Sequence, residues 1–454
     1  MTTLLFLDDL YLNRRDNVIR GIGRPKIIQE SVFHDPYVNT HWGYPTVFRD
    51  EESGKWRILY QGWNFRGPKA PLLAESDDGL RWAPRDTTKD VHIPNRKFPH
   101  QLPVVPFGEW SNCYIDAHAE PAERIKGLVT TGGSVWVSPD GIHWKQKEGV
   151  QWQKESPDPL TSVFWNQVRK SYVLTTRPKG GDRRIAVCET KDWKDFTRPE
   201  LALQADALDT PLTELYGMPV FPYEGYYIGL LWLYHTAPQV EGHSPHKFWD
   251  GHVDCQLAYS LNGWHFQRGL REPFIPNGDP GEPDCGCVYP SSMVHKEDGS
   301  LWIYASACTH EHGYLHPGSG SLIAYRLRRD GFVYLESGGG VGTIGTRALY
   351  WGGGEVEINI QSQGGEARAQ VTDPAGTPLD GYSFADCELF CGDETAWKPV
   401  WKNGKTLQAQ SGKAIRLEVQ LKSARVFAIR GDLVPLIGGQ YGRFMRDFGK
   451  SVKR

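Results

Sequence analysis

Acidic residues precede several predicted β-strands by about five positions, and this spacing has the clearest chemical potential in the sequence. The acids are Glu109, Asp158, Glu214 and, slightly further ahead of its strand, Asp284. Two carboxyl groups at one site can cleave a glycosidic bond, because one protonates the leaving oxygen while the other acts as an ionised base or nucleophile. Like charges crowded in a partly dry site push their pKa values apart, which provides these two roles.

We predict that Asp158 and Glu214 are the working pair. The longer side chain of Glu214 suits the general acid, which leaves Asp158 as the base or nucleophile. Asp284 completes the catalytic group, and with Glu109 it holds sugar hydroxyls or tunes the pKa values of the pair. Simpler roles stay open for both members, because Asp158 follows a proline and could start a turn, and Glu214 could be a solvated rim residue.

A recurring turn motif indicates the architecture that positions these acids. Its copies are ESDDGLRW (75–82), VSPDGIHW (137–144), the degenerate ETKDWKDF (189–196), YSLNGWHF (259–266) and a looser one at Asp330-Gly331. Asp-Gly and Asn-Gly pairs favour tight hairpins, since glycine accepts a positive φ and Asp or Asn tolerates it. Five copies at intervals of 52–70 residues predict five units of about four strands each, the pattern of a five-bladed β-propeller.

Five segments that read strand, polar turn, strand agree with this architecture. They are 44–63, 112–132, 161–178, 217–235 and 291–307. After a glycine-rich join at 336–346, short alternating strands predict a β-sandwich. We therefore expect an all-β protein with a catalytic propeller at 1–337, an accessory sandwich at 338–436 and a basic tail at 437–454.

The inner strands of a propeller line its axis, so residues just ahead of them should meet at one opening. His41 and Trp42 precede the first inner strand, and an aromatic ring can cover the C–H face of a sugar. Packing between blades is an equal alternative for Trp42. Asp254 precedes a third strand, and His310 lies in the histidine-rich CTHEHGYLH (308–316). We expect all four to bind substrate, and because the histidine-rich stretch reads as an irregular loop we expect neither a metal site nor a cofactor.

Composition excludes several other kinds of partner. The 51 Lys and Arg residues nearly balance 54 Asp and Glu residues, which gives no electrostatic reason to expect nucleic acid or an acidic membrane. The longest apolar run, 226–234, is too short to span a bilayer, and the N-terminus lacks the basic segment of a signal peptide. Eight scattered cysteines without a CxxC pair read as buried thiols in a reducing compartment, so we expect a cytoplasmic protein. The oligomeric state stays open.

Several segments resemble bacterial proteins described as similar to glycoside hydrolase family 32, and more broadly the furanosidase-type propeller hydrolases that include family 43. They are FLDDLYLNRRDNVIR (6–20), VFPYEGYYIGL (220–230), DCQLAYSLNGWHF (254–266), REPFIPNG (271–278) and IRLEVQLKSARVFAIR (415–430). The resemblance implies a five-bladed propeller followed by a sandwich and the hydrolysis of a glycosidic bond. The predicted function is accordingly a glycoside hydrolase that acts on an oligo- or polysaccharide.

The resemblance does not extend to the family 32 catalytic residues. That family carries an Asp nucleophile in a stretch like NDPNG, whereas this chain has HWGYPTVFRD (41–50) with no carboxylate at the strand entrance. The RDP and EC signatures are not evident either. The architecture therefore carries over, and the catalytic residues must be sought separately.

Two other functions stay open. A glycoside phosphorylase would need basic residues at the opening, and TTRPKGGDRR (175–184) offers Arg177, Lys179, Arg183 and Arg184. A propeller that only binds carbohydrate or protein is the second alternative, because a fold by itself does not determine a function.

Overall fold

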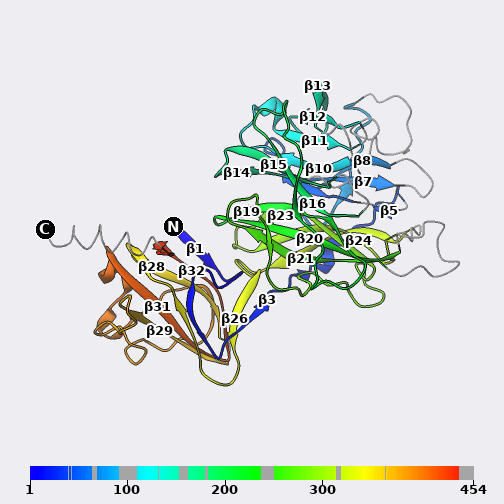
Figure 1. Ribbon diagram of the computed structural model, residues 1–454. Coiled ribbons are helices and arrows are strands. Elements are labelled where there is room, and N and C mark those ends of the chain that lie inside the picture. Colours follow the sequence, from blue (N-terminus) through cyan, green and yellow to red (C-terminus); the bar gives the residue numbers. More distant parts are fainter. Residues whose placement is uncertain are drawn as a thin grey trace. The chain divides into compact units, whose positions relative to one another are not determined.

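The computed structural model describes residues 1–38, 40–41, 43–63, 69–91, 110–130, 132–152, 162–178, 182–236, 250–312, 318–362 and 364–438 (Figure 1). These residues form strands, turns and short 3-10 helices and contain no α-helix, which confirms the predicted all-β class. They divide into two compact units, Pro25–Arg328 and a second that combines Met1–Arg24 with Arg329–Arg454. No helix in the described ranges has the length and apolar character to cross a bilayer.

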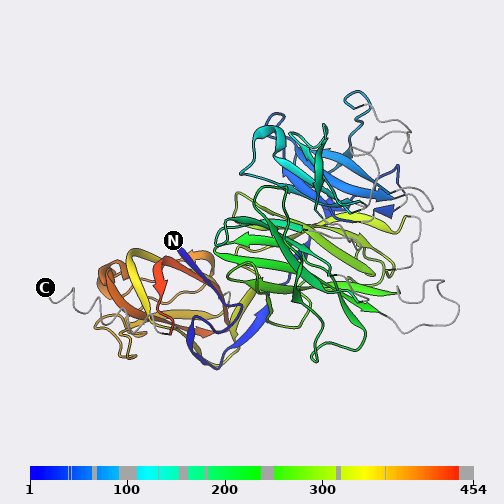
Figure 2. The same ribbon diagram turned by 45° about the horizontal axis from the view of Figure 1, so that its top comes forward.

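The unit Pro25–Arg328 is built from antiparallel sets of four or five strands. The first contains β5 (Thr40–His41), β6 (Thr46–Arg49), β7 (Trp56–Trp63), β8 (Lys69–Ser76) and β9 (Ala83–Pro84). The second contains β10 (Trp110–Ile115), β11 (Ile125–Val129), β12 (Ser134–Ser138) and β13 (Lys145–Gln151). The third contains β14 (Ser162–Asn166), β15 (Ser171–Thr176), β16 (Ile185–Thr190) and β17 (Glu200–Leu203). Figure 2 shows these sheets from a second direction.

A nine-stranded sheet contains the remaining two sets. One consists of β18 (Thr213–Gly217), β19 (Val220–Tyr223), β20 (Tyr226–Thr236), β21 (Gly251–Ser260) and β22 (Gln267–Arg268). The other consists of β23 (Cys287–His295), β24 (Leu301–Cys308), β25 (Gly320–Leu327) and β4 (Lys26–Ile27). A single parallel pair, Val253 with Cys287, joins the two sets.

Inner strands of successive sets contact one another in a closed order. β6 lies against β10, β10 against β14 and β14 against β19, while β20 lies against β23 and β23 returns to β6. Apolar clusters fill the spaces between sets: Leu59 and Ile125 belong to one, and Val173 and Leu231 to another. The predicted strand pairs are thereby confirmed, since each of the five segments forms two adjacent antiparallel strands.

Four copies of the recurring turn share one hydrogen-bond pattern. In the copy at Ser138, the serine Oγ accepts from the Gly141 N–H at 2.8 Å, and the Asp140 carboxylate accepts from the next two N–H groups, both at 2.8 Å. The copies anchored on Ser76, Thr190 and Ser260 repeat these bonds. The four copies lie between β8 and β9, between β12 and β13, between β16 and β17, and between β21 and β22.

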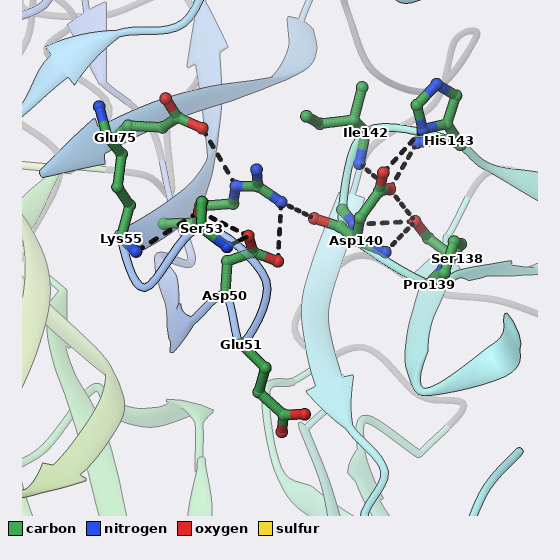
Figure 3. A network of polar contacts seen from close by, with 12 residues as sticks. Asp50, Glu51, Ser53, Lys55, Glu75, Ser138, Pro139, Asp140, Ile142 and His143 are labelled. Atoms are coloured by element: carbon green, nitrogen blue, oxygen red, sulfur yellow. Dashed lines mark hydrogen bonds and ion pairs between the residues drawn. The ribbon is translucent and has the colours of Figure 1, made fainter. Parts of the chain in front are cut away.

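The turn also joins neighbouring sets. Figure 3 shows the copy at Ser138 beside the first set, where the Arg57 guanidinium donates to the Asp140 carbonyl oxygen at 2.9 Å. The same guanidinium pairs with Asp50 at 3.2 Å and Glu75 at 3.1 Å. Equivalent bonds run from the Tyr304 hydroxyl to the Gly79 carbonyl at 2.9 Å, and from the Asn166 amide to the Asn262 carbonyl at 2.8 Å. Three of the four copies therefore form a hydrogen bond to a neighbouring set.

Substitution of the turn glycine should weaken this joint. Gly141 has φ +81°, and an added Cβ would lie 2.9 Å from Cζ of Phe48 in the neighbouring set. We expect Gly141→Ala to lower the free energy of unfolding by about 2–4 kcal/mol, the sum of left-handed strain and overpacking. The matched control is Gly149→Ala at φ +72°, where no atom lies within 4 Å, so that only the conformational strain of about 1–2 kcal/mol applies. Urea unfolding of both variants measures the difference. Equal losses of unfolding free energy would show that the contact between Gly141 and Phe48 of the neighbouring set does not contribute.

The second unit takes its strands from both ends of the chain. N-terminal members are β1 (Thr2–Leu5), β2 (Leu12–Asp16) and β3 (Ile19–Ile22). C-terminal members are β26 (Val333–Ser337), β27 (Gly342–Thr346), β28 (Leu349–Gln361), β29 (Glu366–Thr372), β30 (Asp393–Trp397), β31 (Lys413–Lys422) and β32 (Ala424–Pro435). β1 pairs with β32, β2 with β27 and β3 with β26.

This arrangement differs from the expected domain boundaries. The first 24 residues were expected in the 1–337 domain but belong to the second unit. Their strand β1 pairs with β32, and Leu4 and Phe6 are fully buried there. Asp330-Gly331, the looser fifth copy of the turn, lies in this unit as well, so it is not a joint of the Pro25–Arg328 unit. The outer strand of the fifth set is β4, which pairs with β25. Of the expected tail, 439–454 lies outside the described residues.

Candidate active site

Half of the predicted site lies where the structure gives no side chains. Glu109, Asp158 and Trp42 fall outside the described residues, and His41 is described only as backbone in β5, paired with Gly62. Their roles remain predictions. The described part of the site is therefore formed by Glu214, Asp254, Asp284 and His310.

Glu214 lies on the first strand of the fourth set and forms an ion pair. It stands on β18 opposite Tyr234 of β20 and accepts a hydrogen bond from Arg183, which lies two residues before β16 of the third set. The Glu214 side chain is 21% exposed and that of Arg183 15%. Glu214 is thus a half-buried anion next to a cation, not the freely solvated residue of the alternative interpretation.

Aromatic rings surround this ion pair. The guanidinium carbon of Arg183 lies 5.3 Å from the ring centre of Tyr216 and 5.1 Å from that of Tyr234. Burial opposes the charge, but Tyr216 and the hydrogen bond to Glu214 raise the pKa of Arg183 above its ordinary value. The cation therefore stays charged and keeps Glu214 in place.

Tyr216 connects the fourth set to the fifth. Its ring centre lies 5.8 Å from that of Tyr289 on β23 and 5.0 Å from that of His312. The hydroxyl of Tyr216 and Nε2 of His312 lie 2.9 Å apart, within hydrogen-bond distance. Burial raises the pKa of the phenols of Tyr234 and Tyr289, so both stay neutral at physiological pH. The result is an aromatic cluster with polar edges that is formed by residues of β18, β20 and β23 together with His312.

A second cation lies on the same ring. Arg177 directly follows β15, and its guanidinium carbon lies 5.3 Å from the centre of the Tyr216 ring. Its Nη2 also donates to the Tyr216 carbonyl oxygen at 3.1 Å. Two of the four basic residues that could serve the phosphorylase alternative therefore contact the Tyr216 ring. A third, Arg184, pairs with Asp182 at 3.1 Å.

Asp254 forms a different group with two histidines. Its Oδ2 lies 3.0 Å from Nε2 of His235, and the rings of His235 and His252 stack with centres 4.5 Å apart. Asp254 is 6% exposed, and its Oδ1 has no hydrogen-bond partner among the described residues. These three residues could hold a metal ion, which was not predicted from the sequence.

Asp284 and His310 belong to the fifth set, and no described contact brings either of them to Glu214. Asp284 is 5% exposed and accepts a hydrogen bond from the Tyr325 hydroxyl at 2.5 Å. His310 lies within hydrogen-bond distance of the Thr309 hydroxyl at 2.9 Å, and its backbone would collide with any Cβ added to Gly286. The contacts of Asp284 are those of a structural anchor, and its catalytic role remains a prediction.

Sequence reasoning missed the residues that hold Glu214. Arg183 was considered only as a phosphate ligand, and His312 only as part of a histidine-rich loop. Tyr234 carried one usable signal, because Trp232 and Tyr234 are alternate aromatic residues of one strand and must face the same side.

No family model matches this sequence, and none of the curated proteins matches it. A similar solved structure is an N-acetylgalactosamine deacetylase from F. plautii in complex with blood group B trisaccharide, with 14% identity, 67% of this chain and 94% of that chain covered, and a TM-score of 0.45. Others are the catalytic domain of a Coprinopsis cinerea family 62 α-L-arabinofuranosidase (11% identity, 69% and 97% covered, TM-score 0.42) and a Bombyx mori family 32 β-fructofuranosidase (14%, 89% and 95%, TM-score 0.41). The likeness concerns the arrangement of strands, so the chemistry must be argued from this chain.

Proposed function

We propose that this protein is a glycoside hydrolase whose unit Pro25–Arg328 is a five-bladed β-propeller. The five antiparallel sets and the closed order of their inner strands support the propeller. We further propose that the other unit is a β-sandwich, supported by two strand groups that meet where β28 pairs with β31. In such a propeller the start of β18 lies at the opening of the central funnel.

The observation that carries the proposal is the Glu214–Arg183 ion pair held against Tyr216 and Tyr234. The rings are buried and position the ion pair, and the Glu214 carboxylate, whose side chain is 21% exposed, is the group that can reach a bound sugar. We propose Asp158 as the second carboxyl group, because it precedes β14 as Glu214 precedes β19. Two such groups are the minimal machinery for glycosidic cleavage.

The ion pair suggests roles opposite to those expected from side-chain length. A carboxylate that accepts a charge-assisted hydrogen bond from arginine is suited to work as an anion. We therefore propose Glu214 as the nucleophile or base and Asp158 as the acid. Glu109, His41, Trp42 and His310 are proposed to bind substrate, while Asp284 supports the opening through Tyr325.

A screen of aryl furanosides and aryl pyranosides tests the proposed function. We expect the protein to release the aryl group from at least one series, with NMR of the first product showing whether the anomeric configuration is retained or inverted. If oligosaccharides bind but no aryl glycoside or oligosaccharide is cleaved, the hydrolase proposal is wrong and the propeller is a binding module.

A glycoside phosphorylase is a second candidate, favoured by the two guanidinium groups on Tyr216. Phosphate could replace water as the nucleophile if Arg177 and Arg183 bound it together. Turnover with and without inorganic phosphate separates the candidates. A sugar 1-phosphate product supports the phosphorylase, and equal rates in both conditions support the hydrolase.

A further inference from the structure

We propose that His235, His252 and Asp254 bind one divalent transition-metal ion. One ligand atom from each residue lies within 4.8 Å of the others. His235 and His252 face each other across β20 and β21, and Asp254 lies two residues further along β21, on the same face of the sheet. The strand pairing itself therefore brings the three ligands together.

An unsatisfied carboxylate oxygen points to a missing partner at this place. Asp254 is only 6% exposed. Its Oδ2 lies 3.0 Å from Nε2 of His235, whereas its Oδ1 has no hydrogen-bond partner among the described residues. A buried polar atom without a hydrogen bond costs about 1–3 kcal/mol, more for a charged group. Coordination of a cation would remove this cost.

The ligand set suits a particular class of ion. Two imidazoles and one carboxylate are ligands that Zn²⁺ and neighbouring divalent transition metals accept, whereas Ca²⁺ and Mg²⁺ prefer oxygen alone. Bonds of about 2.0–2.2 Å require ligand atoms roughly 3–4 Å apart. His252 is exposed and can make the small shift that closes the remaining distance, and it leaves the rest of the coordination sphere open to water or another ligand.

The charges around the site favour a cation. Asp254 contributes a negative charge to the site itself, and Glu311 adds a second one near the His252 ring. Because Tyr234 and His235 are consecutive on β20, their side chains leave opposite faces, and the metal site is distinct from the Tyr216 cluster. The inference is therefore independent of glycoside hydrolysis.

Cobalt binding to the full-length protein tests the inference. After removal of metal with a chelator, we expect equilibrium dialysis to show one Co²⁺ or Zn²⁺ per chain, with cobalt d–d absorption bands and no thiolate charge-transfer band. His252→Ala removes an exposed ligand and should leave the fold intact, and Asp254→Asn is a conservative change of the buried one. Each should weaken metal binding at least about tenfold, since even indirect partners of a metal site contribute 10- to 100-fold.

His143→Ala is the matched control. His143 forms an exposed pair with Asp140 at 2.7 Å, but no second histidine or third ligand joins them among the described residues. Metal binding should be unchanged in this variant. Absence of uptake by the wild-type protein overturns the proposal, as do equal affinities in His252→Ala, Asp254→Asn and wild type, or a thiolate charge-transfer band that assigns the ion to cysteines.

Discussion

Replacement of Glu214 by glutamine should lower kcat for glycoside cleavage at least about 100-fold, within the range by which acid–base groups accelerate reactions and below the loss typical of a removed nucleophile. Glutamine keeps the length of the side chain and can still accept a hydrogen bond from Arg183, so the variant loses the negative charge rather than the shape of the site. The measurement is the initial rate of Glu214→Gln and of the wild type on the best substrate of the aryl glycoside screen. The affinity of both proteins for that substrate is measured beside it.

Glu224→Gln provides the matched control for this prediction. Glu224 lies in the exposed turn between β19 and β20 of the same set, away from the strand end that carries Glu214. Its activity should equal that of the wild type. A Glu214→Gln protein with wild-type rate would remove Glu214 from the catalytic group.

The leaving group of the substrate separates the two roles. A general acid becomes dispensable when the leaving group is a good one, whereas a nucleophile or base does not. We therefore expect a dinitrophenyl glycoside to restore most of the rate of Asp158→Asn and little of that of Glu214→Gln. The reverse pattern would assign Glu214 to the acid, as its side-chain length first suggested.

The largest effect on stability is expected in the other unit, from Asp330→Ala. Asp330 is fully buried and pairs with Arg430, which is 1% exposed, and its second oxygen accepts from the Asn359 amide at 2.9 Å. Removing one partner leaves an uncompensated charge in the interior, which costs about 3–5 kcal/mol. Alanine is also disfavoured at the Asp330 φ of +58°. Urea unfolding should show the loss.

Two further variants assign this loss to the charge. Asp330→Asn keeps a side chain that tolerates the left-handed conformation but lacks the charge, so it should remain destabilised, by less than Asp330→Ala. Combining Asp330→Asn with Arg430→Met removes both charges and should recover part of the stability. Additive losses in the double variant would show that the pair is not coupled.

Local features of this protein could be derived from its residues alone. The recurring turn depends on contacts within four residues: the Ser138 hydroxyl and the Asp140 carboxylate satisfy the next backbone donors, and Gly141 supplies the positive φ. Strand pairs such as β14 and β15 are likewise joined by short turns and announced by alternating apolar residues. These signals were sufficient for the all-β class and for the succession of antiparallel sets.

Contacts between distant segments were decided only by the tertiary structure. Nothing local in residues 1–24 reveals that they complete the C-terminal unit, because strand pairing is selected by long-range burial rather than by the strand itself. Glu214 meets Arg183 from another set, and Asp330 meets Arg430 at a separation of 100 residues. His235, His252 and Asp254 come together only through the register of β20 and β21. The sequence thus determined the repeated units, and the register and closure of the sheets determined which side chains share a site.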